Sequence, residues 1–279
     1  MKKILITGAG SYIGVSFENY LKQSDEYEVS TVDMLDPEWE NKSFDGFDAV
    51  FHVAGITHIK ETDQNRDLYY KVNRDLVIKT AKKAKSEGVK QFVFLSTMSV
   101  YGLNQGVITK DTEMRPVNAY GKSKLMAEEA ITALVDSSFT VTVVRPPMVY
   151  GKGCKGNFNT VVKLANKSPV FPSIKNQRSM IFIDNLCEFI KMVIDKEKGG
   201  IYCPQNREYV NTTDMARLIA KAMGKRVWFS RLAGLAVVVL RPVAGILQKA
   251  FGTLIYKDLE QFGFEYCVTD FEDSVRKSL

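Results

Sequence analysis

Short apolar segments alternate with segments of helical periodicity through the first half of the chain. The apolar runs have the length of buried parallel strands, and each is followed by apolar positions three or four residues apart. The predicted strands are 3–7, 27–32, 49–53, 91–96, 140–144 and 179–184, and the predicted helices include 13–21, 68–85, 118–134 and 186–194. This alternation predicts an α/β fold with a doubly wound parallel sheet and right-handed crossovers.

A glycine-rich loop joins the first predicted strand to the first predicted helix. Residues 7–14 read TGAGSYIG. Glycines allow a tight turn and a close backbone approach to a pyrophosphate, and the helix N-terminus offers free N–H groups. Asp33 follows about twenty residues later, at the end of the second strand, where an acid binds the adenine ribose and repels a 2′-phosphate. The pattern predicts a dinucleotide site that favours NAD, with NADP as the alternative.

The regular alternation extends to residue 150 and loosens beyond it. We therefore predict a NAD-binding Rossmann-type domain from 1–150, to which 179–195 adds a further strand and helix. The segments 151–178 and 196–279 are predicted to form a smaller substrate-binding lobe over the carboxyl edge of the sheet.

Tyr120 and Lys124 lie four residues apart in a predicted helix, so their side chains share one face. Free tyrosine, with a pKa of about 10, is a poor base at neutral pH. A nearby ammonium group favours the phenolate, which can then take a hydroxyl proton while hydride moves to the nicotinamide. Thr97, just after the strand ending at Ser96, could hold the same oxygen.

These motifs together resemble the extended short-chain dehydrogenase/reductases, specifically the NAD-dependent epimerase/dehydratase group that acts on nucleotide sugars. The resemblance covers nearly the whole chain. It is carried by TGAGSYIG (7–14), Asp33, FHVAG (51–55), Asn73, STMSVYG (96–102), YGKSK (120–124), RPPMVYGKG (145–153) and RSMIFIDNL (178–186).

The resemblance implies a role for each matching residue. The catalytic residues would be Thr97, Tyr120 and Lys124. The cofactor would be bordered by Gly8, Gly10, Ser11, Tyr12, Ile13, Gly14, Asp33, Ala54, Gly55, Asn73, Tyr120, Lys124 and Pro147. The substrate would be contacted by Thr97, Met98, Ser99, Asn157 and Arg178, with Arg178 on the diphosphate.

Three positions depart from the family pattern. Ser11 replaces the middle glycine of the loop. Its hydroxyl could donate to a phosphate, so we expect the loop to bind the cofactor despite this replacement. Met98-Ser99 stands where family dehydratases carry Asp-Glu, which argues against a 4,6-dehydratase. Met148 stands where many epimerases have Asn, so the identity of the substrate stays undecided.

Three functions remain compatible with these residues. The leading hypothesis is an NAD-dependent 4-epimerase of a UDP-hexose or UDP-N-acetylhexosamine, acting through a transient 4-keto sugar in bacterial polysaccharide biosynthesis. The first alternative is an NAD(P)H-dependent reductase of a 4-keto-6-deoxy nucleotide sugar. The second is a non-catalytic NAD(P)-binding regulatory protein.

The composition of the chain argues against some classes of binding partner. The 279 residues are 45% apolar and 25% charged, with a net charge of +6. Lys and Arg are dispersed, so we expect no nucleic-acid partner. Two histidines and four scattered cysteines predict no metal site. No leader peptide is apparent, so we expect a cytoplasmic protein. The resemblance suggests a homodimer.

The segment 228–251 is unusually apolar. Its longest run, LAGLAVVVL at 232–240, is too short to cross a bilayer, and Arg241-Pro242 interrupts the segment. We expect a buried helix pair of the substrate lobe or a dimer surface here. The alternative is an interfacial helix in peripheral contact with a membrane.

Overall fold

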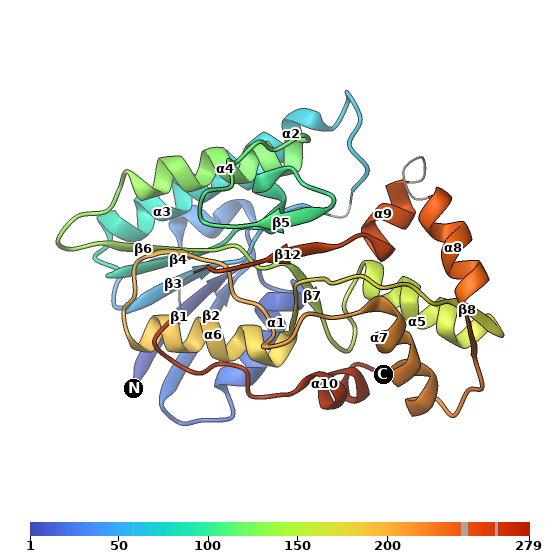
Figure 1. The fold of residues 1–279 in the computed structure, drawn as a ribbon. Coiled ribbons are helices and arrows are strands. Elements are labelled where there is room, and N and C mark those ends of the chain that lie inside the picture. Colours follow the sequence, from blue (N-terminus) through green and yellow to red (C-terminus); the bar gives the residue numbers. More distant parts are fainter. Residues whose placement is uncertain (58, 241–244, 260–261) are drawn as a thin grey trace.

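The computed structural model describes residues 1–57, 59–240, 245–259 and 262–279, without the side chains of 157, 245 and 246. Its centre is a six-stranded sheet in which every neighbouring pair is parallel, in the order β10-β6-β4-β3-β1-β2 (Figure 1). The strands are β1 (Lys2–Thr7), β2 (Tyr27–Val32), β3 (Ala49–His52), β4 (Gln91–Leu95), β6 (Thr140–Val144) and β10 (Gly200–Tyr202). The predicted doubly wound parallel sheet is confirmed.

The chain reverses its direction of travel across the sheet at β1. It leaves β1 to form β2 on one side and returns to form β3 on the other side. At such a switch point the loops after the two central strands diverge and leave a crevice for a ligand. The loops after β1 and β3 are those that contain the two glycine motifs.

Helices cover both faces of the sheet. One face carries α1 (Tyr12–Leu21) and α6 (Ile183–Asp195), and the other carries α2 (Arg66–Tyr70), α3 (Leu76–Ser86) and α4 (Ala119–Thr132). A π-helical segment, Lys71–Asp75, joins α2 to α3, so the predicted helix 68–85 is one continuous element with a widened turn. Side chains alternate along β1: Ile4 and Ile6 pack on the α1 and α6 side, while Leu5 packs on the other.

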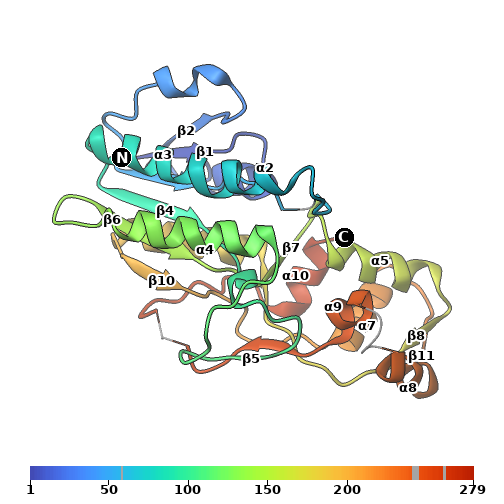
Figure 2. The ribbon, with the colours of Figure 1, turned by 90° about the horizontal axis from the view of Figure 1, so that it is seen from above.

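A smaller lobe lies beyond the carboxyl ends of the strands (Figures 1 and 2). Its helices are α5 (Asn157–Lys167), α7 (Thr212–Ala222), α8 (Arg231–Leu240), α9 (Gly245–Phe251) and α10 (Phe271–Lys277). Three parallel strand pairs link it together: β5 (Gly106–Ile108) with β12 (Leu254–Tyr256), β7 (Met148–Tyr150) with β9 (Met180–Phe182), and β8 (Val170–Pro172) with β11 (Trp228–Ser230). Short 3₁₀ helices occupy Pro37–Asn41 and Met98–Tyr101.

Two strands differ from the predicted division of the chain. The strand expected at 179–184 forms as β9, but it pairs with β7 rather than extending the main sheet. The outer strand of the main sheet is β10, which lies in a segment assigned to the lobe. Both strands have only three residues, too few for periodicity to indicate a partner, so tertiary contacts decide where they pair.

Candidate active site

The glycine loop is held by the ends of its neighbouring strands. The N–H groups of Gly8 and Ala9 donate to the Val32 carbonyl at 2.9 and 3.1 Å, which ties the loop to the end of β2. On the other side, a β-carbon on Gly8 would lie 2.8 Å from the backbone nitrogen of Ala54. Gly8 also has a φ of 112°, where other residues are strained. The loops after β1, β2 and β3 therefore converge at Gly8.

Ser11 caps helix α1. Its side chain accepts a hydrogen bond from the Gly14 N–H at 3.2 Å, and its φ of −71° is unstrained for serine. The loss of the family glycine at this position is thereby explained by a helix cap. The N–H groups of Tyr12 and Ile13, the first two of the helix, have no acceptor within the helix and remain free for a phosphate.

The side chain of Tyr12 takes another direction. Its hydroxyl group is buried and has no hydrogen-bond partner among the described residues. A β-carbon on Gly151 would lie 2.6 Å from that hydroxyl oxygen, so the ring points toward the Gly151 loop. Burial raises the pKa of Tyr12. The side chain of Ile13 packs against the core. Both residues can therefore serve a dinucleotide through their backbone.

Asp33 directly follows β2 and is exposed. One carboxylate oxygen, Oδ1, accepts the Leu35 N–H at 2.9 Å. The preceding residue, Val32, accepts the N–H groups of Gly8 and Ala9, so Asp33 follows directly on the residue that holds the glycine loop. The loop, the free N–H groups and the acid fit a dinucleotide with an unmodified adenine ribose.

Asn73 holds the second glycine loop in place. Its side chain is fully buried; Oδ1 accepts from the Ile56 N–H and Nδ2 donates to the Ile56 carbonyl, both at 2.9 Å. Asn73 therefore fixes the backbone at Ile56, and its contact with the cofactor stays a prediction. Ala54 is buried and Gly55 is exposed, so the open face of this loop lies at Gly55.

Lys124 lies beside that loop. Its side chain is 4% exposed, and Nζ donates to the Leu95 carbonyl at the end of β4 at 2.9 Å. A β-carbon on Gly55 would lie 3.4 Å from Nζ. Burial lowers the pKa of Lys124 to about 7, although the nearby charge of Glu128 opposes this shift. The amino group is therefore sensitive to any hydroxyl or charge that enters the crevice.

Tyr120 lies one helical turn before Lys124 on α4, whose first turn is capped by Asn118 through a 2.8 Å bond from the Gly121 N–H. Burial raises the pKa of Tyr120, whereas hydrogen bonds with the side chains of Thr57 and Thr97 lower it. The structure thus brings the predicted residues Thr97, Tyr120 and Lys124 to one place. It adds Thr57, which the sequence analysis missed, because a threonine two residues after Gly55 carries no local signal of contact with α4.

A buried ion pair supports this part of α4. Glu128 and Arg145 are both nearly inaccessible, and the Arg145 Nε lies 3.1 Å from the Glu128 Oε2. The Ser96 hydroxyl donates to Glu128, and the Arg145 Nη1 donates to the Tyr101 hydroxyl at 2.9 Å. The pair joins the ends of β4 and β6 to α4, one turn beyond Lys124. No sequence motif indicated it.

The predicted substrate residues occupy different surroundings. The Met98 N–H donates to the Pro146 carbonyl at 3.0 Å, which brings the Thr97 loop against the segment that contains Pro147. Met98 and Pro147 are buried, and Ser99 is half-buried with its N–H bound to the Thr97 Oγ1 at 3.1 Å. The side chain of Asn157 lies outside the described part of the structure.

Arg178 is a buried cation in the lobe. It is 8% exposed, and Nη1 donates to the Gly252 carbonyl at 2.9 Å. Within the described residues its Nε has no hydrogen-bond partner and its guanidinium forms no ion pair. Burial lowers its pKa. An anion would supply the missing partner, because a buried charge is costly unless it is paired.

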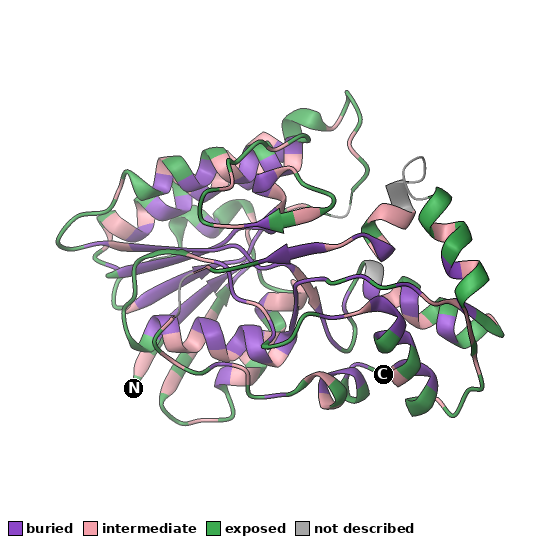
Figure 3. Ribbon diagram, viewed as in Figure 1, coloured by how far each residue is buried: buried purple, intermediate pink, exposed green. Residues whose placement is uncertain are grey.

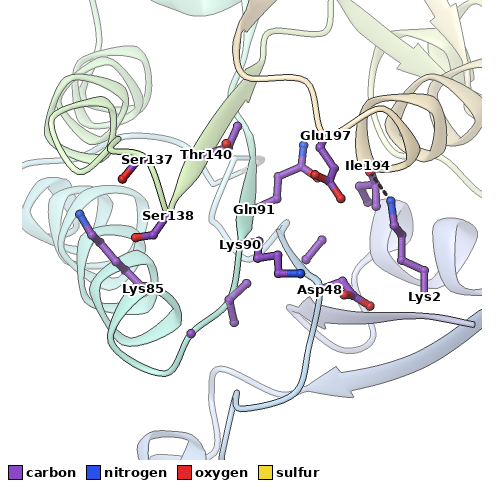
Figure 4. Close-up of a pocket in the computed structure, with 13 residues that line it drawn as sticks. Lys2, Asp48, Lys85, Lys90, Gln91, Ser137, Ser138, Thr140, Ile194 and Glu197 are labelled. Carbon is purple, nitrogen blue, oxygen red and sulfur yellow. Dashed lines mark hydrogen bonds between the residues drawn. The ribbon is translucent and has the colours of Figure 1, made fainter.

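A separate hollow lies at the amino-terminal edge of the sheet. It measures about 400 Å³ and is lined by the strand starts at Lys2, Gln91 and Thr140, together with Asp48 and Glu197 (Figure 4). Thr97 and the glycine loops follow the opposite, carboxyl ends of the strands. The hollow is therefore distinct from the Thr–Tyr–Lys cluster.

A family model described as the NAD dependent epimerase/dehydratase family matches residues 4–203. The chain belongs to this family. It is 30% identical to a UDP-glucose 4-epimerase of Vibrio cholerae over 81% of this chain and 77% of that protein. It is 25% identical to the N-acetyl-alpha-D-glucosaminyl-diphospho-ditrans,octacis-undecaprenol 4-epimerase of Escherichia coli O157:H7, over 80% of this chain and 73% of that protein.

A solved structure shares the whole fold. The UDP-glucuronic acid 4-epimerase of Bacillus cereus, in complex with NAD, matches 99% of this chain and 97% of its own with a TM-score of 0.77 at 17% identity. At 17% identity this similarity shows a shared fold alone.

Proposed function

We propose that the protein is an NAD-dependent 4-epimerase of a UDP-hexose or UDP-N-acetylhexosamine. The observation that carries this proposal is the convergence of Thr57 and Thr97 on the Tyr120 hydroxyl, with Lys124 one helical turn away and against the Gly55 loop. This arrangement supports a role for Tyr120 as a tunable proton acceptor at the switch point of a dinucleotide-binding sheet.

Bound nicotinamide would supply a reversible acceptor for hydride from C4 of the sugar. Tyr120, as the phenolate, takes the proton of the sugar 4-hydroxyl, and the hydroxyls of Thr57 and Thr97 stabilise the charge on its oxygen. Protonated Lys124 favours the phenolate by its charge. When the 4-keto sugar presents its other face, Tyr120 returns the proton, so the residue ends the cycle as it began.

The lobe supplies the substrate contacts in this proposal. The guanidinium of Arg178 holds the diphosphate, because among the described residues its Nε has no hydrogen-bond partner and the group forms no ion pair. Met98 and Ser99 after the catalytic Thr97 provide no acid for water elimination, and Met98 is buried. A dehydratase reaction is therefore disfavoured. The names of the Vibrio cholerae and Bacillus cereus proteins support a UDP-sugar as substrate. A homodimer and a cytoplasmic location stay predictions.

The purified protein can be tested without added cofactor. Acid denaturation of the protein should release bound NAD. Incubation with UDP-glucose and UDP-N-acetylglucosamine should form the C4 epimer, which is detected by NMR of the anomeric protons. Tyr120→Phe should retain NAD and lose turnover by about 10²-fold or more. Tyr27→Phe is the matched control, because that hydroxyl binds Asp195 at 2.8 Å, at the start of β2.

Three outcomes would contradict the proposal. Turnover of a 4-keto sugar only with added NAD(P)H would identify a reductase. Bound NAD with no turnover of either substrate class would identify a binding protein. Survival of activity in Tyr120→Phe would reject the mechanism itself.

A further inference from the structure

The lobe contains a long segment without a single acidic residue. Residues 215–257 include eight Lys and Arg and no Asp or Glu, whereas the net charge of the whole chain is only +6. The basic residues are Arg217, Lys221, Lys225, Arg226, Arg231, Arg241, Lys249 and Lys257. The remainder of the chain is therefore net negative, and the positive charge is concentrated on one part of the lobe.

Helix α8 lies within this segment and packs on the lobe along one narrow side. Gly234 is buried, and a β-carbon there would lie 2.1 Å from the carbonyl oxygen of Ser173. This glycine therefore allows the helix to rest directly on the chain after β8. Ala233 and Val237, on the same side, are half-buried.

The opposite side of α8 is apolar and open to solvent (Figure 3). This α8 face consists of Leu232, Leu235, Ala236, Val238, Val239 and Leu240. The exposed fractions of Leu232 and Val239 are 81% and 68%, and that of Trp228, in the preceding strand, is 75%. The expectation of a buried helix pair is thus wrong for α8 within this chain. A surface helix normally turns polar side chains outward, and a contiguous apolar face marks an interaction site.

The charges next to this face are uncompensated. Lys225, Arg226 and Arg231 are exposed just before the α8 face, and none of them has an ion pair in the described part of the chain. Apolar side chains flanked by Lys, Arg and Trp are the composition of helices that lie in the interface of an anionic membrane.

We propose that the α8 face docks on the surface of a bilayer that contains anionic lipids. Its apolar side chains enter the boundary of the acyl chains, and the flanking cations bind the headgroup phosphates. A second copy of this chain is a poorer occupant, because a twofold contact through this segment would bring like charges together, and residues 215–257 contain no acidic residue to pair them.

The helix lies on the membrane and does not span it. Its ten residues measure about 15 Å, half the thickness of the hydrocarbon core of about 30 Å. Among the described residues no helix is both long and apolar enough to cross a bilayer.

Docking through α8 would bring the Arg178 region to the membrane. Helix α8 rests through Gly234 on Ser173, five residues before Arg178 in the chain, and the Gly252 carbonyl just after α9 accepts a hydrogen bond from the Arg178 guanidinium. The Thr212 hydroxyl also donates to the Ala250 carbonyl at 2.8 Å, which secures the end of α9 to α7. The docking helix is therefore joined to the part of the lobe that carries the buried cation.

Vesicle sedimentation tests the proposal with the full-length protein. Wild-type protein should sediment with vesicles of phosphatidylglycerol and phosphatidylethanolamine and stay in solution with phosphatidylcholine vesicles. The double variant Leu235→Gln/Val239→Gln should lower the partition coefficient about tenfold or more, because two apolar side chains no longer leave water. Arg226→Gln and Arg231→Gln should each lower it about fivefold, and high salt should reduce binding of the wild type.

The matched control is Val135→Gln, an exposed valine in the turn after α4, which should sediment like the wild type. Equal sedimentation of wild type and the α8 double variant would overturn the proposal, as would failure of the wild type to bind any vesicle. If light scattering shows that the double variant converts a dimer to a monomer while vesicle binding is unchanged, the face is a self-association surface instead. None of these readouts depends on turnover, so they are independent of the proposed epimerase activity.

Discussion

Gly8 and Ala54 pack backbone against backbone where the loops after β1 and β3 meet. A β-carbon on Gly8 would lie 2.8 Å from the Ala54 nitrogen and 2.9 Å from its α-carbon. The Ala54 N–H is itself bound to the Thr7 carbonyl at 3.0 Å, so the backbone cannot retreat without breaking this bond. The width of the crevice thus depends on the absence of a side chain at residue 8.

Gly8→Ala should therefore weaken NAD binding by about 100-fold or more, because the added methyl group forces the two cofactor loops apart. Gly46→Ala is a suitable control: Gly46 also has a positive φ, of 80°, but a β-carbon there would meet nothing within 4 Å. Both variants should lose stability from backbone strain. Titration calorimetry should show weakened NAD binding for Gly8→Ala and wild-type affinity for Gly46→Ala. Equal affinities of the two variants would show that residue 8 does not set the width of the crevice.

Thr57→Val should shift the pH dependence of turnover toward alkaline pH. The Thr57 hydroxyl lowers the pKa of Tyr120, so its removal raises that pKa and moves the rising acid limb of kcat toward higher pH. At neutral pH kcat should fall about tenfold. Thr57→Ser keeps the hydroxyl and should restore the wild-type profile. An unchanged limb in a folded Thr57→Val protein would show that Thr57 does not act on Tyr120.

Glu128→Gln should destabilise the protein strongly, because it leaves the Arg145 cation buried without its partner. The expected loss in the free energy of unfolding is about 3 to 5 kcal/mol, measured by urea denaturation. The double variant Glu128→Gln/Arg145→Met should recover part of this loss. The exposed pair Glu113 and Arg115 offers the comparison: Glu113→Gln should leave the urea midpoint nearly unchanged.

His52 should make the protein sensitive to mild acid. Its side chain is fully buried against Phe92 and Phe94, and its Nδ1 lies 2.7 Å from the Thr7 hydroxyl. Burial lowers the pKa of His52 to about 3, with a further contribution from the charge of Lys124. Because the unfolded chain takes up the proton near pH 6.5, stability is complete above that pH and falls as the pH drops toward about 3.

The expected slope from His52 is about 1.4 kcal/mol of unfolding free energy per pH unit below about pH 6.5. Urea denaturation at about pH 7 and about pH 5 measures it. His52→Leu should lack this component and be less pH-dependent over that interval. An identical pH dependence in the variant would assign the acid sensitivity to other groups.

The sequence by itself determined five of the six strands of the main sheet, all but β10, and the glycine-rich loop between β1 and α1. Strand and helix positions depend on local periodicity, so 27–32 and 140–144 were predicted with the bounds that the structure has. The spacing of Tyr120 and Lys124 likewise needs only the geometry of one helix to place both side chains on a single face.

Tertiary structure decided what converges on those residues and what remains uncovered. Thr57 meets Tyr120 only because the loop after β3 and the start of α4 come together in space, and Glu128 meets Arg145 only across packed elements. The apolar segment that forms α8 was expected to be either a buried helix of the lobe or a dimer surface, with an interfacial membrane helix as the alternative. Whether an apolar helix is covered depends on the elements that pack around it, and periodicity within the segment carries no information about them.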